Sequence, residues 1–341
     1  MITKTGSSLQ RSSSSDNWQT ELANAIREPE ALLEALDLPV SLLGPARQAA
    51  TRFPLRVTQS YLSRIEPGNP NDPLLRQILP IADELDAKDW GQLDPVGDHQ
   101  AMPSPGLLHK YQGRALLVST AACAIHCRYC FRQHFPYQQA NPLGTQWPAT
   151  LAYLKQHPDI SEVILSGGDP LSLGDEKLAK LVTQLETIEH IKTLRLHSRL
   201  PVVLPSRITS NLINWLRNSR FQMVLVLHIN HPNEINQEVM EALEPLRDLP
   251  LTLLNQAVLL KGINDQLETQ VELSQRLFQA GILPYYLHQL DPVSGAAHFA
   301  VSVQNGLSLM SELQNHLPGY LVPNYVQEIA GSASKIPLTQ P

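Results

Sequence analysis

Three cysteines within eight residues give the strongest chemical signal in this sequence. They are Cys123, Cys127 and Cys130, and the 341 residues contain no other cysteine. Three thiolates in one loop can bind three irons of a [4Fe–4S] cube and leave the fourth iron open to a small molecule. On spacing alone two alternatives stay open: a zinc site completed by His126 or His134, and three unrelated buried thiols.

A glycine pair and a lysine near the C-terminus are the next candidates. Gly167, Gly168 and Asp169 follow an apolar run. Two glycines let a ligand approach the backbone closely, whereas the alternative is an ordinary turn with Asp169 as a helix cap. Lys335 lies among small residues. Most such lysines are solvated, but a lysine in a small-residue loop can bind the aldehyde of pyridoxal phosphate (PLP) as a Schiff base.

Six short apolar segments predict the strands that must position these groups. They span residues 115–119, 162–165, 193–196, 222–227, 251–254 and 284–287. Helical patterns lie between them, including 175–188, 208–218, 233–246 and 265–280. This alternation predicts an α/β fold, a partial (β/α)6 TIM-like barrel with a six-stranded parallel sheet. Polar residues and glycines follow each predicted strand, where such barrels build their active sites.

The remaining segments are expected to complete this barrel. Residues 1–15 are Ser-rich and predict a disordered leader, after which Asp16 is placed to cap a first helix. Residues 16–105 predict a helical N-terminal region, with helices in 29–37 and 46–64, that covers the open side. Residues 106–298 would form the partial barrel, and residues 299–341 a C-terminal segment that carries the cofactor-binding Lys335.

Composition and charge exclude several classes of protein. The chain has 26 Lys and Arg against 32 Asp and Glu, a net charge of -6, so no global basic field exists to hold nucleic acid or anionic lipid. The N-terminus lacks the apolar core of a signal peptide, and no stretch approaches the ~20 apolar residues of a membrane span. We therefore expect a cytoplasmic protein with neither nucleic acid nor membrane as a partner.

The motifs together resemble a known family. The cysteine spacing, with Tyr129 before the last cysteine, resembles the signature of the radical S-adenosylmethionine (SAM) superfamily. Further motifs over about residues 65–337 resemble the lysine 2,3-aminomutase family. These are Asp72-Pro73, Arg76-Gln77, Pro105-Gly106-Leu107, His109-Lys110-Tyr111, Arg114, Cys130-Phe131-Arg132, Ser166-Gly167-Gly168-Asp169, His197-Ser198-Arg199-Leu200-Pro201, His231-Pro232-Asn233-Glu234, Asn255-Gln256, Asn264-Asp265 and the stretch from Gly331 to Pro337.

The resemblance implies three cofactors, a [4Fe–4S] cluster, SAM and PLP, and a role for each matching residue. Cys123, Cys127 and Cys130 would ligate the cluster. The surroundings of SAM would be Gly167, Gly168, Asp169, His228 and Gln256. Lys335 would hold PLP, with Arg114 and Lys110 near its phosphate. Arg132 would pair with the α-carboxylate of the substrate, a task that suits its planar guanidinium, and Asp291 and Glu328 would face the ε-ammonium of lysine.

The resemblance also implies a reaction and a cellular role. The family converts L-lysine to β-lysine by moving the amino group from Cα to Cβ. With no cysteine beyond the cluster loop, this chain resembles the shorter branch that makes (R)-β-lysine for elongation factor P, to which a ligase attaches it. Glu328 stands where the family has an aspartate, so the charge is kept on a longer arm. The sequence leaves the oligomeric state open.

Two alternatives remain at this point. One is a related radical mutase for another amino acid such as glutamate, for which Asp291 and Glu328 carry the wrong charge. The other is a non-catalytic iron–sulfur or zinc protein associated with translation.

Overall fold

The computed structural model describes residues 17–86 and 90–339. The predicted leader, residues 1–15, and the predicted cap Asp16 lie outside the described residues. In the part of the chain that is described, no helix has the length and apolar character needed to cross a membrane.

A nine-stranded sheet forms the centre of the molecule, with its strands side by side in chain order. The strands are β1 (Leu107–Tyr111), β2 (Arg114–Thr120), β3 (Glu162–Gly167), β4 (Thr193–Ser198), β5 (Gln222–His228), β6 (Leu251–Val258), β7 (Leu283–His288), β8 (Asn324–Gln327) and β9 (Ile336–Pro337). Strands β2 to β8 run parallel, and β1 and β9 pair antiparallel at the two edges.

All six predicted strands are present as β2 to β7, but the predicted sheet had too few strands. Strand β1 pairs with β2 in a hairpin that turns at Gly113, whose φ is +79°. Strands β8 and β9 have four and two residues. Segments this short carry no periodic signal, so the C-terminal strands were missed.

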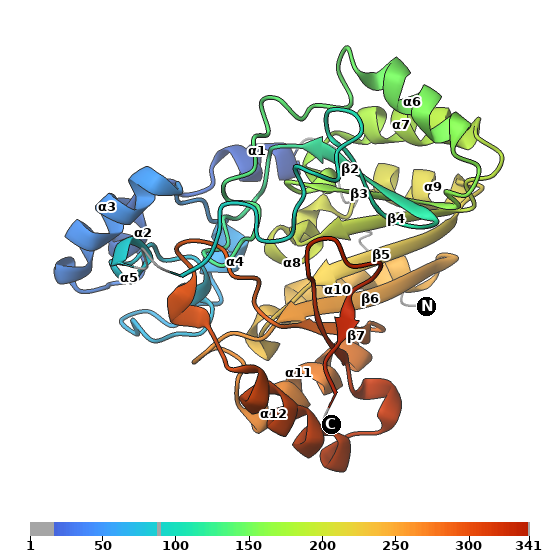
Figure 1. Ribbon diagram of the computed structural model, residues 1–341. Coiled ribbons are helices and arrows are strands. Elements are labelled where there is room, and N and C mark those ends of the chain that lie inside the picture. The colour runs from blue at the N-terminus through green and yellow to red at the C-terminus, as the bar shows by residue number, and fades with distance from the viewer. Residues whose placement is uncertain (1–16, 87–89, 340–341) are drawn as a thin grey trace, which may run out of the picture.

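One long helix follows each of strands β2 to β7, which confirms the partial (β/α)6 arrangement. These helices are α6 (Trp147–Gln156), α7 (Asp175–Glu186), α9 (Ser210–Asn218), α10 (Gln237–Arg247), α11 (Leu267–Gln279) and α12 (Val303–His316). Helix α7 shows why they pack as they do, since its buried Leu178, Leu181, Val182 and Leu185 share one face. Figure 1 shows these helices along the outside of the sheet.

Short helices complete the secondary structure. The N-terminal region contains α1 (Asn17–Ala23), α2 (Pro29–Ala35), α3 (Leu43–Arg52), α4 (Gln59–Leu62) and α5 (Asp83–Asp86), and α8 (Leu200–Val203) follows β4. The 3-10 helices are η1 (Val40–Leu42), η2 (Leu75–Gln77), η3 (Pro170–Ser172), η4 (Pro205–Arg207), η5 (Pro232–Glu234), η6 (Ala297–Phe299) and η7 (Gly319–Leu321).

The predicted continuous helix over 46–64 was wrong in its middle. Helix α3 ends at Arg52, and its C-cap Phe53 is extended with φ -135° and ψ 111°. Pro54 follows, and the residue before a proline disfavours the helical conformation. The chain then pairs Val57 with Ile26 before Thr58 caps α4. The proposed division of the chain after residues 105 and 298 stays a prediction.

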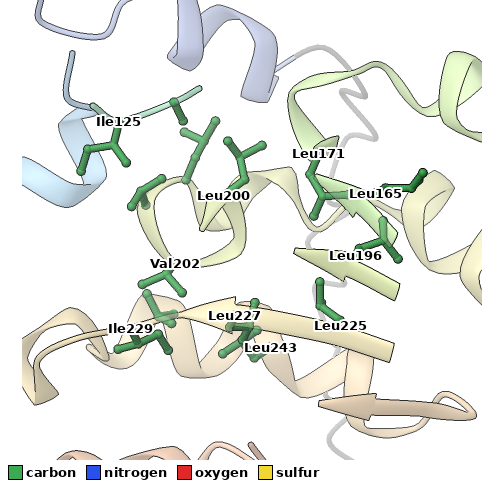
Figure 2. Close-up of a cluster of buried hydrophobic side chains, with 14 of the residues drawn as sticks. Ile125, Leu165, Leu171, Leu196, Leu200, Val202, Leu225, Leu227, Ile229 and Leu243 are labelled. Carbon is green, nitrogen blue, oxygen red and sulfur yellow. The ribbon is translucent and has the colours of Figure 1, made fainter. Parts of the chain in front are cut away.

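The N-terminal region shares its hydrophobic core with the barrel. Trp18, Leu32 and Tyr61 belong to the same buried cluster as side chains of strands β2 to β6. Figure 2 shows part of this cluster, where Ile125 of the cysteine loop lies near Leu200 of α8. The loop that carries the cysteines is therefore anchored in the core through an apolar side chain.

Candidate active site

A cavity lies at the carboxyl ends of the parallel strands, and every site residue predicted from the sequence lines it. Strand geometry explains its polar lining, because alternate side chains point to opposite faces. On β4, Arg195 and His197 face the cavity, whereas Leu194 and Leu196 are buried in the core. A complete TIM barrel fills its interior with apolar side chains, whereas this partial barrel keeps polar ones there.

The cysteine loop follows β2 and is held by the N-terminal region. The backbone N–H of His126 donates to the Arg56 carbonyl at 3.0 Å, and that of Arg128 donates to the Gln77 carbonyl at 2.9 Å. The Arg128 side chain is fully buried and forms an ion pair with Glu84. These contacts fix the backbone on both sides of Cys127.

The three cysteine side chains fit a cluster better than a single metal ion. All three line the cavity, and none forms a disulfide. Among residues 17–86 and 90–339, no group of three His, Cys, Asp or Glu side chains is arranged to hold one ion. In a cube each thiolate binds a separate iron, so the sulfurs need not converge on one point.

The two histidines considered as zinc ligands do not belong to the cavity lining that contains the three cysteines. His126 Nδ1–H donates to the Pro54 carbonyl at 2.8 Å, and His134 Nε2 lies 3.3 Å from the Ser294 carbonyl. Burial raises the pKa of Cys123, and it raises that of Cys130 to about 12. Bound iron would supply the positive charge that stabilises these thiolates.

The glycine pair holds the start of the cysteine loop against β3. A side chain at Gly168 would collide with the Ala122 carbonyl, and Gly167 has a φ of +118°. The Gly168 N–H donates to the Thr120 carbonyl at 2.7 Å, and the Asp169 N–H donates to the Ala122 carbonyl at 2.7 Å. Any residue with a Cβ at position 168 would push the cysteine loop away.

The Asp169 carboxylate acts as a helix cap in this structure. It accepts hydrogen bonds from the backbone N–H of Leu171 at 3.0 Å and of Arg199 at 2.7 Å, and from Ser198 Oγ at 2.7 Å. The cap considered from the sequence is therefore present. Because Asp169 also lines the cavity beside the cysteines, its role near SAM stays a prediction that this geometry permits.

A chain of alternating charges lines the part of the cavity around Lys335, which we call the lysine end, and the part around the three cysteines is called the cysteine end. Lys335 Nζ lies 2.5 Å from Glu328 Oε2, and Lys110 Nζ lies 3.0 Å from Glu328 Oε1. Lys110 also pairs with Asp98 at 2.6 Å, and Asp98 pairs with Arg132 Nε at 2.6 Å. The β8–β9 pairing sets Gln327 opposite Ile336, which brings the adjacent Glu328 and Lys335 together.

Asp98 is a site-forming residue that the sequence did not reveal. It lies in the irregular stretch before β1, and its side chain is only 2% exposed. No motif or periodicity marks it. Its ion pairs with Lys110 and Arg132, two cations that line the cavity, arise only in the folded chain.

The carboxyl groups at this end differ in their ionisation. Although burial opposes it, the neighbouring Lys335 and Lys110 lower the pKa of Glu328 to about 2. Burial and the nearby Glu328 instead raise the pKa of Asp291 to about 7. Asp291 Oδ1 is buried and has no hydrogen-bond partner among the described residues. Within that part of the chain, Asp291 is thus a carboxyl group without an ion-pair partner.

Three histidines line the cavity, of which His288 is buried and His197 and His228 are partly buried. Burial lowers the pKa of His228 to about 3 and lowers those of His197 and His288 strongly. Gln256 Nε2 donates to His228 Nε2 at 2.8 Å, which places the proton of His228 on Nδ1. In the described part of the chain, the Nε2 atoms of His197 and His288 have no hydrogen-bond partner. These two side chains can bond to a ligand, and the sequence had assigned them no role.

Arg114 is a cation available to an anion. Its guanidinium lies 4.6 Å from the centroid of the Tyr111 ring, and it forms no ion pair with the described residues. Such a stacked guanidinium keeps its donors free to bind a phosphate. The residues proposed for PLP therefore offer a cation for its phosphate and the amine of Lys335.

The chain is similar to several characterised proteins. A family model described as a 4Fe-4S single cluster domain matches residues 112–198. The L-lysine 2,3-aminomutase of Escherichia coli (strain K12) is 47% identical over 95% of both chains. The corresponding protein of Haemophilus influenzae is 46% identical over 94% of both chains. That of Clostridium subterminale is 35% identical over 95% of this chain and 78% of its own. At these identities and coverages, the chain belongs to the L-lysine 2,3-aminomutase family.

Proposed function

We propose that this chain is a radical SAM, PLP-dependent enzyme that isomerises L-lysine to (R)-β-lysine. The observation that carries the choice of substrate is Asp291, a buried carboxyl group with an unpartnered oxygen in a cavity that also contains Arg132. A basic amino acid satisfies both groups, because its ammonium can pair with Asp291 and its α-carboxylate with Arg132. An acidic substrate such as glutamate would leave Asp291 without a counter-ion.

The cysteine end would hold the cluster and SAM. Cys123, Cys127 and Cys130 would ligate the cluster, with SAM surrounded by Gly167, Gly168, Asp169, His228 and Gln256. The lysine end would hold PLP through Lys335, Arg114 and Lys110. When bound, the cluster and SAM supply a carbon radical that removes a hydrogen atom, and PLP supplies a π-system that delocalises the unpaired electron.

The protein's own side chains would bind and orient the substrate. Arg132 would hold the α-carboxylate, while Asp291 and Glu328 would hold the ε-ammonium. The overall change is an isomerisation in which a C–N bond breaks at Cα and forms at Cβ, while one hydrogen moves from Cβ to Cα. Both lysines proposed to hold PLP are the present partners of Glu328. Glu328 would therefore face substrate only in the enzyme that contains PLP.

We further propose that the β-lysine is used to modify elongation factor P in the cytoplasm. This proposal is supported by the absence of cysteines outside positions 123–130, as expected for the short branch of the family. The free amino acid would pass to a ligase that joins it to the factor. Incubating the enzyme, the ligase and elongation factor P together, and weighing the factor by mass spectrometry, tests this role. A factor whose mass stays unchanged while β-lysine accumulates would contradict it.

The reaction is tested by anaerobic incubation of reconstituted protein with L-lysine, SAM, PLP and dithionite. Mass spectrometry is expected to find β-lysine and 5′-deoxyadenosine, and chiral separation is expected to find the R product. Deoxyadenosine without β-lysine would retain the radical chemistry and reject lysine as substrate. Absence of both products from protein with an intact cluster would reject the catalytic proposal. L-Glutamate in place of lysine provides the comparison substrate.

A further inference from the structure

Arg199 stands out among the buried cations because it contacts a cysteine of the cavity. Its Nη1 donates to Cys127 Sγ at 2.8 Å, and its side chain is 6% exposed. We propose that Arg199 is a positioning residue that raises the reduction potential of the cluster bound at Cys127, and that Glu234 limits this effect. The proposal rests on the proposed function, since it takes Cys127 to be a cluster ligand.

The guanidinium of Arg199 is held rigidly at this place. Nη2 donates to Glu234 Oε2 at 2.8 Å and to Gln77 Oε1 at 2.7 Å. Nη1 also donates to the Tyr129 hydroxyl at 2.8 Å. These acceptors engage both Nη groups, whereas Nε has no hydrogen-bond partner among the described residues, and the Nη1 donor therefore stays directed at Cys127.

The backbone of Arg199 is fixed as well. Its N–H donates to Asp169 Oδ2 at 2.7 Å, and the residue is the N-cap of α8. An arginine guanidinium is not deprotonated in proteins. The side chain is therefore a permanent, fixed cation in contact with one sulfur.

The direction of the effect follows from electrostatics. Reduction adds one negative charge to a cluster, and hydrogen bonds and charges near the sulfurs set the potential. A buried cation that donates to a thiolate stabilises the reduced form, so it raises the potential. Glu234 is fully buried and pairs with the same guanidinium, which lowers the field that reaches the cluster. Among the described residues, no cationic side chain donates a hydrogen bond to the sulfur of Cys123 or Cys130.

Two substitutions at Arg199 separate charge from hydrogen bonding. Arg199→Met removes both, whereas Arg199→Gln keeps a neutral donor. After anaerobic reconstitution, the midpoint potential is measured by a redox titration followed by electron paramagnetic resonance. Because a charge-assisted hydrogen bond changes an equilibrium by about tenfold or more, Arg199→Met is expected to lower the potential by about 59 mV or more. Arg199→Gln is expected to fall between Arg199→Met and the unmodified protein.

Glu234→Gln tests the same proposal in the opposite direction. It leaves the Arg199 charge uncompensated, so the potential is expected to rise. This variant also tests the role of Arg199 if Arg199→Met does not incorporate a cluster. If Glu234→Gln then had the same midpoint potential as the unmodified protein, the proposal would be overturned.

Arg207→Met is the matched control. Arg207 is fully buried, with 0% exposure, and its side chain pairs with Asp175 rather than with a cysteine. Loss of this pair is expected to lower stability and leave the potential unchanged. An equal shift in Arg199→Met and Arg207→Met, or no shift in Arg199→Met with full iron content, would overturn the proposal.

Failure of the proposed function gives different results. Unmodified protein that binds no iron would refute the cysteine assignment itself. Unmodified protein that binds a cluster and makes no β-lysine would refute the assignment of lysine as the substrate. The potentials of the variants would still be measurable.

Discussion

At the cysteine end of the cavity one buried cation, Arg199, donates to acceptors from several distant segments, whereas at the lysine end the charges pair mainly with one another. Arg199 meets Cys127, Gln77 and Glu234. The lysine end is a chain that runs from Lys335 through Glu328 and Lys110 to Asp98 and Arg132. Most members of this chain are the groups proposed to bind cofactor or substrate. The first end is therefore organised before ligands arrive, and the second must exchange partners when they bind.

The N-terminal region supports both ends, although it was predicted only as a cover. It supplies Tyr61 and Gln77 to Arg199, and it supplies Asp98 to Lys110 and Arg132. It also provides Glu84, which pairs with Arg128 between two of the cysteines. Substitutions in this region are thus expected to affect the reaction even where the substituted residue contacts no cofactor or substrate.

The largest expected effect is at the lysine end. Lys335→Ala removes the amine proposed to hold PLP, so β-lysine formation should fall by about 10³-fold or more, with loss of the visible absorbance of bound PLP. Lys261→Ala, at an exposed lysine, is the control. Turnover by Lys335→Ala within a few-fold of the unmodified protein would show that the charges of this end serve structure alone.

The next effect tests the preorganisation of the cysteine end. Arg128→Leu leaves the buried Glu84 without its cation, and breaking a buried pair in this way destabilises a protein by roughly 3–5 kcal/mol. Chemical denaturation of the full chain measures this change. Arg47→Leu removes the exposed partner of Glu30 and should lower stability by about 0.5 kcal/mol or less. Similar losses of stability in the two variants would contradict the distinction between a rigid cysteine end and an adaptable lysine end.

The sequence predicted what depends on local pattern. The apolar runs of β2 to β7 are recognisable in the sequence without any partner strand, and the cysteine spacing falls within one loop. Arg199 and Asp98 could not be found in this way. Their contacts join residues 122 positions apart for Arg199 and Gln77, and 34 for Asp98 and Arg132. Such contacts depend on the packing of the N-terminal region, which leaves no periodic trace at either position.

A smaller effect is expected at Asp291, the member of the lysine end that lacks a cation. Asp291→Asn should raise the KM for lysine by roughly 10- to 100-fold, because a hydrogen bond to a charged group contributes about 1.5–3 kcal/mol. Measured kcat should change less, since the ammonium lies away from the reacting carbons. Asp159→Asn, at an exposed position, is the control. An unchanged KM in Asp291→Asn would show that the substrate ammonium binds elsewhere in the cavity.

The smallest effect is a pH dependence that only the lysine end should show. Burial and Glu328 raise the pKa of Asp291 to about 7, so the carboxyl is protonated and neutral below that pH and ionised above it. Only the ionised form attracts an ammonium, and the KM for lysine should therefore fall several-fold as pH rises through about 7. In Asp291→Asn this step should disappear, because an amide does not ionise. If the step persisted in Asp291→Asn, another group would control the binding of lysine. The lysine end would then no longer differ from the cysteine end in having a carboxyl group that gains its cation only when substrate binds.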